Sequence, residues 1–155
     1  MNRRDLILSA SALTLFGQEG HALETSVGSL DVARVASRLD NPWGFGFLPD
    51  GTILVTERDG ALKRVQQGKV NQVDGVGRVA RGGQGGLLDI LVPSDFTDTR
   101  TLFFTFSKPQ SRGKGTAIAR AQLTADASRL EDWQTIFEIK QGSSGGRHFG
   151  SRLVE

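Results

Sequence analysis

One histidine lies among glycines near the C-terminal end of the chain, in the segment 145–153. This residue, His148, is the only histidine outside the first 22 residues. Histidine can take up a proton near neutral pH, so an imidazole in such a segment is a candidate general base. A lone histidine is more often a surface residue or a satisfied core residue. The role of His148 therefore depends on the elements that position it and on what they place beside it.

Short apolar runs alternate with turn sequences through the middle of the chain. The turns of the first series are Pro49-Asp50-Gly51, Arg58-Asp59-Gly60 and Gln67-Gly68. Glycine adopts the positive φ that tight hairpin turns require, so these sequences between β-prone runs predict hairpins. The four strands predicted here form an antiparallel meander, and they are residues 43–48, 52–57, 61–65 and 69–73.

A second series of four strands follows with different residues. Repetition of a four-stranded unit is typical of β-propeller blades, and the fold class predicted from this pattern is all-β. Residues 149–154 are predicted to begin a third series. The strands of the second series are 86–92, 101–106, 116–123 and 134–139, and the loops between them are 93–95, 110–115 and 125–132.

Residues that precede the first strand of each blade lie at one mouth of a propeller channel. Three short stretches occupy this place: Trp43-Gly44, Gln84-Gly85-Gly86 and His148-Phe149-Gly150. We expect them to converge although they are far apart in the sequence. Glycines at such a place allow the close approach of another backbone or of a flat ligand. Crowded packing at the axis explains the same glycines equally well.

Length and composition limit the possible functions. A chain of 155 residues corresponds to about one domain. It has no cysteine, which excludes thiol nucleophiles, disulfides and thiolate metal sites. The net charge is +2, and the basic residues are scattered along the sequence rather than clustered in one stretch. We therefore expect no nucleic-acid partner.

The first 22 residues have the pattern of an export signal. Arg3 and Arg4 precede an apolar stretch from Leu6 to Phe16, and small residues follow at Gly20 and Ala22. The apolar stretch is too short to span a bilayer, so we expect no membrane anchor after cleavage. The adjacent arginines are compatible with a twin-arginine signal. The predicted organisation is a signal peptide at 1–22 and a propeller segment at 23–155, in a periplasmic or secreted protein.

Four motifs form a recognisable set in this chain. They are Asn41–Gly51 (NPWGFGFLPDG), Leu54–Arg58 (LVTER), Gly83–Asp89 (GQGGLLD) and His148–Val154 (HFGSRLV). Four motifs in a fixed order match by chance far less readily than one. In order and spacing they strongly resemble the opening third of the PQQ-dependent sugar dehydrogenases, the glucose/sorbosone dehydrogenase family. The soluble aldose sugar dehydrogenases are the branch that the chain resembles most, and the resemblance covers nearly all of residues 30–154.

The resemblance implies a six-bladed β-propeller, of which this chain would supply the first two blades and the start of the third. It implies oxidation of the anomeric hydroxyl of aldose sugars to lactones, with pyrroloquinoline quinone (PQQ) as cofactor and an external electron acceptor. His148 matches the family's catalytic histidine, which removes the hydroxyl proton as a hydride moves to the quinone. Gln84 matches a glutamine near the sugar and the cofactor. Calcium accompanies the cofactor with its principal ligands in later blades, so no metal ligand is assigned here.

The residue types agree with these implied roles. A neutral imidazole suits removal of a hydroxyl proton near neutral pH, and the quinone carries the redox step. Gln84 can donate and accept hydrogen bonds without titrating. Arg147 and Arg152 flank the histidine, and their guanidinium groups suit either an anionic cofactor or an acidic neighbour in the protein. An acidic residue is expected in place of Arg147 in the glucose dehydrogenase branch, so the sugar preference of that branch is not transferred.

The family pattern also predicts that four of six blades lie outside these 155 residues. We therefore expect the chain by itself to be inactive, and we leave open whether it is an enzyme on its own. One alternative is a non-catalytic binding module that assembles with other chains, which predicts folded oligomers without quinone binding. Another is a calcium-dependent lactonase-like propeller, although its usual acidic metal ligands are not evident at the strand starts.

Overall fold

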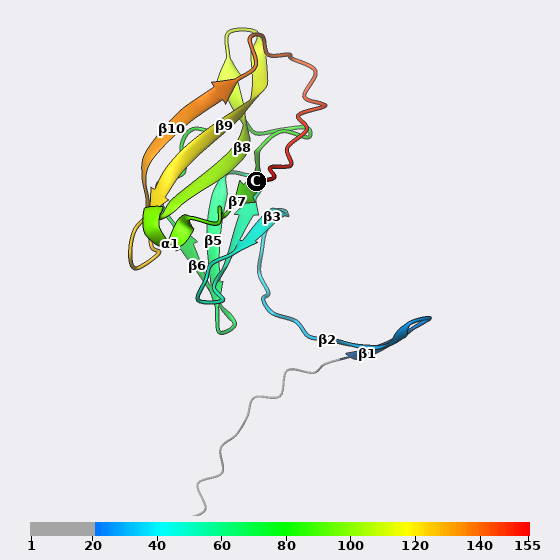
Figure 1. Ribbon diagram of the computed structural model, residues 1–155. Coiled ribbons are helices and arrows are strands. Elements are labelled where there is room, and N and C mark those ends of the chain that lie inside the picture. The colour runs from blue at the N-terminus through cyan, green and yellow to red at the C-terminus, as the bar shows by residue number, and fades with distance from the viewer. Residues whose placement is uncertain (1–20) are drawn as a thin grey trace, which may run out of the picture. The chain divides into compact units, whose positions relative to one another are not determined.

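The structure, a computed structural model, describes residues 21–155 in two compact units, one ending at Arg34 and one comprising Val35–Glu155 (Figure 1). In the first unit, β1 (His21–Thr25) and β2 (Gly28–Val32) pair as an antiparallel hairpin that the sequence did not predict. Residues 1–20 of the predicted export signal lie outside the described residues, and its last two residues belong to β1. No helix in the described part of the chain is long and apolar enough to cross a membrane.

The second unit contains two four-stranded antiparallel sheets, each a meander with its strands in sequence order. Turns at Gly51, Gly60 and Gly68 join the strands of the first sheet, and each of these glycines has a positive φ. The first sheet consists of β3 (Pro42–Phe47), β4 (Ile53–Glu57), β5 (Ala61–Gln66) and β6 (Lys69–Val73). The second consists of β7 (Leu87–Leu91), β8 (Thr101–Gln110), β9 (Gly113–Leu123) and β10 (Leu130–Glu138).

All eight strands predicted for the two series are therefore present, with differences at their ends. β8 and β9 extend through polar residues to a two-residue turn at Ser111 and Arg112, because ladder hydrogen bonds do not require apolar side chains. The predicted loop at 93–95 continues into α1 (Phe96–Thr99), a single helical turn. Phe96 in this turn is buried in the core, which explains why a polar segment folds back onto the sheet.

The prediction of a strand at 149–154 is wrong, since these residues have no strand conformation in the structure. A strand is stabilised by a ladder to a neighbour, and no described strand pairs with this segment. It is held instead by hydrogen bonds to side chains of the second sheet. In Figure 1 the chain after β10, drawn in red, runs back beside the sheets and ends near β7.

The first strands of the two sheets pack against each other, and both have an irregular register where they meet. The β3–β4 register shifts between Pro42 and Phe45, and the β7–β8 register shifts between Leu87 and Ile90. Such bulges bend a strand and redirect its side chains, and they are frequent beside active sites. The sequence did not predict either bulge.

A threonine joins the two sheets at this junction. The buried Thr56 hydroxyl accepts a hydrogen bond from the backbone N–H of Gly44 at 2.9 Å and donates to the carbonyl of Leu88. A Cβ at Gly44 would lie 3.0 Å from the Leu88 carbonyl oxygen, so only glycine allows this approach without displacement. The core continues from here between the sheets and includes Leu54, Leu62, Leu87, Leu102, Phe104 and Phe106.

The outward face of β3 carries aromatic side chains that are about half exposed. Trp43, Phe45 and Phe47 alternate with glycines along the strand and are 47%, 61% and 61% exposed. Alternation places the glycines toward β7 and the aromatic rings on the opposite side. The first sheet is therefore apolar on both faces, which is unusual for a sheet that meets water on one side.

Candidate active site

The structure brings His148 and Gln84 into direct contact although 64 residues separate them. The backbone N–H of His148 donates to the side-chain Oε1 of Gln84 at 2.9 Å. The backbone N–H of Gln84 in turn donates to the carbonyl of Gly146 at 2.9 Å. Both residues are exposed, so the side chains of His148 and Gln84 are open to solvent in the second unit. This is the pair of site residues that the sequence predicted.

The backbone of His148 has a φ of 62°, in the left-handed region that residues other than glycine adopt infrequently, with asparagine, aspartate and histidine the most frequent among them. In this conformation the N–H of His148 points to Oε1 of Gln84. Strained backbone of this kind is retained where the surroundings over-determine it, and such residues gather at functional sites. The backbone conformation of His148 is consistent with a functional role for this residue rather than a role in core packing.

Glycines in the loop before β7 allow the loop to lie against two other backbones. A methyl group at Gly83 would overlap the carbonyl oxygen of Gly146, and one at Gly86 would overlap the carbonyl oxygen of Arg58. Gly82 and Gly83 both have positive φ, and the N–H of Gly85 closes a turn onto the carbonyl of Gly82. The close backbone approach expected at this loop is therefore present, toward protein segments on both sides.

Side chains of three strands hold the segment that follows His148. Thr116 on β9 donates through its hydroxyl to the carbonyl of Phe149 at 2.7 Å, and Thr105 on β8 donates to the carbonyl of Ser151 at 2.7 Å. Asp89 on β7 accepts the N–H of Leu153 at 2.7 Å. Each backbone group thereby receives a partner that a strand ladder would otherwise supply.

Trp43 completes the convergence that the sequence predicted. Its indole N–H lies 3.4 Å from the hydroxyl oxygen of Ser151, three residues beyond His148. Trp43 belongs to the bulge of β3, while Gln84 precedes β7. The three stretches expected at one mouth are thus neighbours in the second unit.

The two arginines beside the histidine differ in their surroundings. Arg152 pairs with the buried carboxylate of Asp89 at 3.0 Å while its own side chain is 75% exposed. Arg147 is exposed and belongs to none of the ion pairs found among residues 21–155. Arg152 is therefore engaged by the protein, and Arg147 is the arginine with its guanidinium turned to solvent beside the candidate site.

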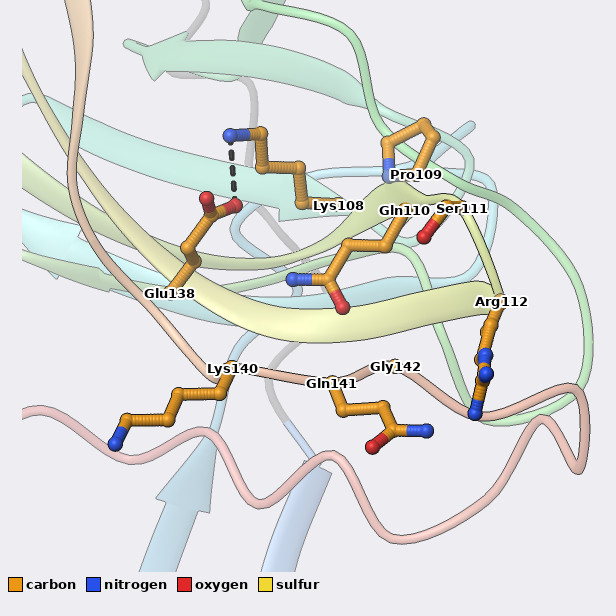
Figure 2. A pocket seen from close by; sticks show the side chains of 9 residues that line it. All are labelled: Lys108, Pro109, Gln110, Ser111, Arg112, Glu138, Lys140, Gln141 and Gly142. Atoms are coloured by element: carbon orange, nitrogen blue, oxygen red, sulfur yellow. Dashed lines mark ion pairs between the residues drawn. The ribbon is translucent and has the colours of Figure 1, made fainter.

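A hollow of about 560 Å³ lies at the end of the β8–β9 hairpin. Its charged side chains do not converge on one ligand-binding position. Figure 2 shows its two unpaired cations, Lys140 and Arg112, at opposite ends. The third, Lys108, forms an ion pair with Glu138 at 2.7 Å, and its ammonium lowers the pKa of that carboxyl. Gln110 donates to the carbonyl of Ile139 at 2.8 Å and so attaches the chain after β10 to the hairpin.

Comparison with known proteins identifies the family of this chain. The family model described as glucose/sorbosone dehydrogenase matches residues 39–155. The chain belongs to this family. An aldose sugar dehydrogenase of Escherichia coli, YliI, is 38% identical over 137 residues, which cover 86% of this chain and 37% of that protein. An uncharacterized protein of Synechocystis, slr1608, is 41% identical over 130 residues, covering 77% of this chain and 31% of that protein.

Solved structures of the glucose/sorbosone dehydrogenase family agree with the two sheets. The soluble aldose sugar dehydrogenase of E. coli, in its apo-form, has a TM-score of 0.72 at 40% identity and is matched over 76% of this chain and 35% of its own. The aldose sugar dehydrogenase of Streptomyces coelicolor, in its PQQ-bound form, has a TM-score of 0.68 at 25% identity, over 88% and 39%. The two four-stranded sheets thus match part of a propeller dehydrogenase, and the chain spans about a third of the length of these relatives.

The residues near His148 fit the cofactor that the S. coelicolor relative binds. PQQ is flat and carries carboxylates, so it requires hydrogen-bond donors, a cation and an open surface. Gln84 provides an amide, Arg147 an exposed guanidinium, and Trp43 a half-exposed ring. The residues do not fit calcium in the same way, because no group of three or more His, Cys, Asp or Glu side chains able to hold a metal occurs among residues 21–155.

Proposed function

We propose that this chain supplies the first two blades, and the His148 segment that follows them, of a six-bladed propeller that oxidises aldose sugars to lactones with PQQ. The observation that carries the proposal is the contact between His148 and Gln84 within the motifs of the glucose/sorbosone dehydrogenase family. The two meanders have the four-stranded form of propeller blades, and their first strands pack against each other as neighbouring inner strands would.

In this proposal His148 is the general base. The imidazole is exposed beside the glycine loop, where the anomeric hydroxyl of a sugar can reach an unprotonated ring nitrogen. Transfer of the hydroxyl proton to that nitrogen places electron density on the oxygen, which favours loss of the hydrogen on the same carbon as a hydride. The carbon–oxygen bond becomes a carbonyl, and the sugar leaves as a lactone. Bound PQQ supplies the acceptor for the hydride.

Gln84 positions both the base and the ligands. Its Oε1 fixes the backbone of His148, and its amide nitrogen carries two N–H donors for a sugar hydroxyl or a cofactor oxygen. Arg147 offers a charged donor for a cofactor carboxylate. Calcium, which the resemblance implies, receives no role for the residues described, and its ligands are proposed to belong to other parts of a family-length protein.

Export to the periplasm or the medium, with cleavage after Ala22, is a further part of the proposal and rests on the sequence of residues 1–22. Reoxidation by an external electron acceptor, and the absence of a membrane anchor and of a nucleic-acid partner, belong to the same proposal. N-terminal sequencing of the protein recovered from cell fractions tests the cleavage and the compartment together.

The function is tested in a family-length protein, meaning a chain of the relatives' length that carries residues 1–155. Such a chain is either encoded by the same gene or built by joining this segment to the remaining part of the E. coli relative. Given an aldose and an artificial acceptor, it should form lactone only after PQQ is added. Two electrons should pass to the acceptor for each lactone formed. Sugar oxidation that is indifferent to PQQ would contradict the proposal.

A further inference from the structure

A lysine outside all four family motifs lies between the Gln84 loop and the His148 segment. Lys114 is the second residue of β9, directly after the hairpin turn. Its backbone forms an isolated bridge with Ser143, with N–H···O distances of 3.2 and 3.0 Å. The backbone of Lys114 therefore holds the chain five residues before His148 against the second sheet.

The side chain of Lys114 reaches the other loop. Its ammonium donates to the carbonyl of Arg81 at 2.7 Å and to that of Gly82 at 2.5 Å. These carbonyls precede Gln84 by three and two residues. Hydrogen bonds from a charged donor are about twice as strong as those between neutral groups, so the ammonium restrains this exposed part of the loop.

The same side chain also lies against the residues on both sides of His148. A Cβ at Gly146 would lie 3.9 Å from Lys114 Cε, and the ammonium lies 5.9 Å from the centre of the Phe149 ring. Phe149 is buried, so its ring is a fixed partner for the cation. Lys114 thus contacts the Gln84 loop through its ammonium, and it lies against the His148 segment through its backbone bridge to Ser143 and through its ammonium over Phe149.

Lys108 on the neighbouring strand shows that this arrangement is specific to Lys114. In the β8–β9 ladder Lys108 stands opposite Gly115, one residue from Lys114. Its ammonium pairs with the Glu138 carboxylate on β10, as Figure 2 shows. Because successive residues of a strand point to opposite faces, Lys108 and Lys114 lie on opposite faces of the sheet, and Lys114 is the one that reaches the Gln84 loop.

We propose that Lys114 is a positioning residue of this site, whose ammonium holds the carbonyls of Arg81 and Gly82 so that Gln84 meets the backbone of His148. The inference rests on the proposed function for its consequence in catalysis, while its structural part stands on the contacts alone. Lys114 does not touch the reacting atoms. Loss of the ammonium frees the glycine loop, in which Gly82 and Gly83 have no side chains to restrain it.

The structural part is tested by amide hydrogen exchange in the 155-residue chain. Lys114→Met keeps the aliphatic stem and removes the charge, Lys114→Arg restores a donor for two carbonyls, and Lys108→Met is the matched control. The backbone N–H groups of Gln84 and His148 should exchange roughly tenfold faster in Lys114→Met, with β4 and β8 unchanged. Lys114→Arg and Lys108→Met should retain the slow rates. Unchanged exchange at Gln84 and His148, or equal acceleration through β4 and β8, would overturn the inference.

The catalytic part is tested in the family-length protein, with rates counted per PQQ-loaded molecule so that unfolded protein does not contribute. Lys114→Met should lower kcat roughly tenfold to a hundredfold, because small displacements of a catalytic group are costly, while PQQ affinity changes less than twofold. Lys114→Arg should recover most of kcat. A merely structural role would reduce the folded yield and leave kcat per loaded molecule unchanged, and that result would refute positioning.

The two proposals can fail separately. If substitution of His148 leaves turnover intact, the proposed function fails, and the exchange rates still decide whether Lys114 fixes the loop. If His148 proves essential and Lys114→Met behaves like the parent protein in both measurements, the function stands and the inference about Lys114 is wrong.

Discussion

At the scale of single residues, the site requires glycine at positions where a side chain would overlap a neighbouring backbone. Gly86 lies where a methyl group would overlap the carbonyl oxygen of Arg58, which also accepts the N–H of Leu87 at 3.0 Å. The neighbouring backbone belongs to the end of the first sheet and cannot yield as a flexible side chain can. Glycine is thus required here for close approach between two sheets.

Gly86→Ala is therefore expected to destabilise the chain by about 3 kcal/mol, the upper part of the range for overpacking a core. Gly145→Ala is the control, since the nearest atom to a Cβ there is the Ser143 hydroxyl at 3.3 Å. That variant should change stability by no more than about 0.5 kcal/mol. Urea unfolding of the two variants measures the difference, and equal midpoints would contradict this account of the loop.

The sequence predicted His148 and Gln84 because both belong to motifs that resemble a known family. It missed Lys114, which stands in a hairpin without a motif and acts through partners 32 and 33 residues away. Asp89 was visible in a motif, yet its role depends on Leu153 and Arg152, and such pairing across 63 or 64 residues leaves no local signal. The site residues that belong to a motif were thus predictable from the sequence. Their long-range hydrogen-bond and ion-pair partners were not.

At the scale of elements, the segment after His148 is stabilised by side chains in place of a ladder. Asp89 is 2% exposed and accepts the N–H of Leu153. Loss of the carboxylate leaves that N–H without its acceptor, and an unmade buried hydrogen bond is costly. The pairing with Arg152 contributes less, because the guanidinium is largely in water.

Asp89→Ala should therefore lower the free energy of unfolding by about 1–3 kcal/mol and speed amide exchange at Leu153. Asp89→Asn keeps an acceptor oxygen and should cost less. Arg152→Ala should cost less than Asp89→Ala, because the guanidinium is 75% exposed while Asp89 keeps its hydrogen bond to Leu153. Urea unfolding and exchange rates check the order, and a larger loss in Arg152→Ala than in Asp89→Ala would show that the ion pair is the principal contact.

The loop between β9 and β10 offers a prediction about pH. Hydrogen bonds from Thr124 and Ser128 to its carboxylate lower the pKa of Asp126 to about 2. A lowered pKa means that the charged form stabilises the loop above the ordinary Asp value of about 3.9, and that this stability is lost as pH falls toward 2. The NMR titration of the Asp126 carboxyl should have its midpoint near 2. In Thr124→Val it should move upward, and a midpoint near 4 in the parent chain would refute the loop geometry.

Strand prediction succeeded where hairpin glycines separate apolar runs, as in β3 to β6. It failed at 149–154 because composition alone cannot show that side chains of β7, β8 and β9, rather than a backbone ladder, bond this segment. The bulges of β3 and β7 were also beyond prediction, since they arise from packing between the two sheets at Gly44 and Leu88.

At the scale of the whole molecule, the chain spans about a third of its relatives and contains two of the sheets that such propellers repeat. A propeller blade packs on two neighbours, and a blade without one exposes an apolar face. The outward face of β3, with Trp43, Phe45 and Phe47 exposed, has this character. The candidate site likewise has His148 and Gln84 exposed on an open surface.

The 155 residues expressed alone are therefore expected to show no dehydrogenase turnover when given PQQ, calcium, an aldose and an artificial acceptor. An open surface does not exclude water or enclose a ligand on all sides, and oriented binding is needed for the reaction. Appreciable turnover would contradict this expectation. Sedimentation of the same sample separates a monomer from the folded oligomers that a non-catalytic binding module predicts, and PQQ titration shows whether either form binds the quinone.

We propose that His148, in the position that the structure gives it, removes the hydroxyl proton of the sugar. Because the φ of His148 is 62°, His148→Asn is a better test than His148→Ala, since asparagine tolerates the left-handed conformation and cannot act as the base. In the family-length protein loaded with PQQ, His148→Asn should lower kcat for aldose oxidation by roughly a hundredfold to ten-thousandfold with PQQ affinity retained. An unchanged kcat in the PQQ-loaded variant would contradict the account.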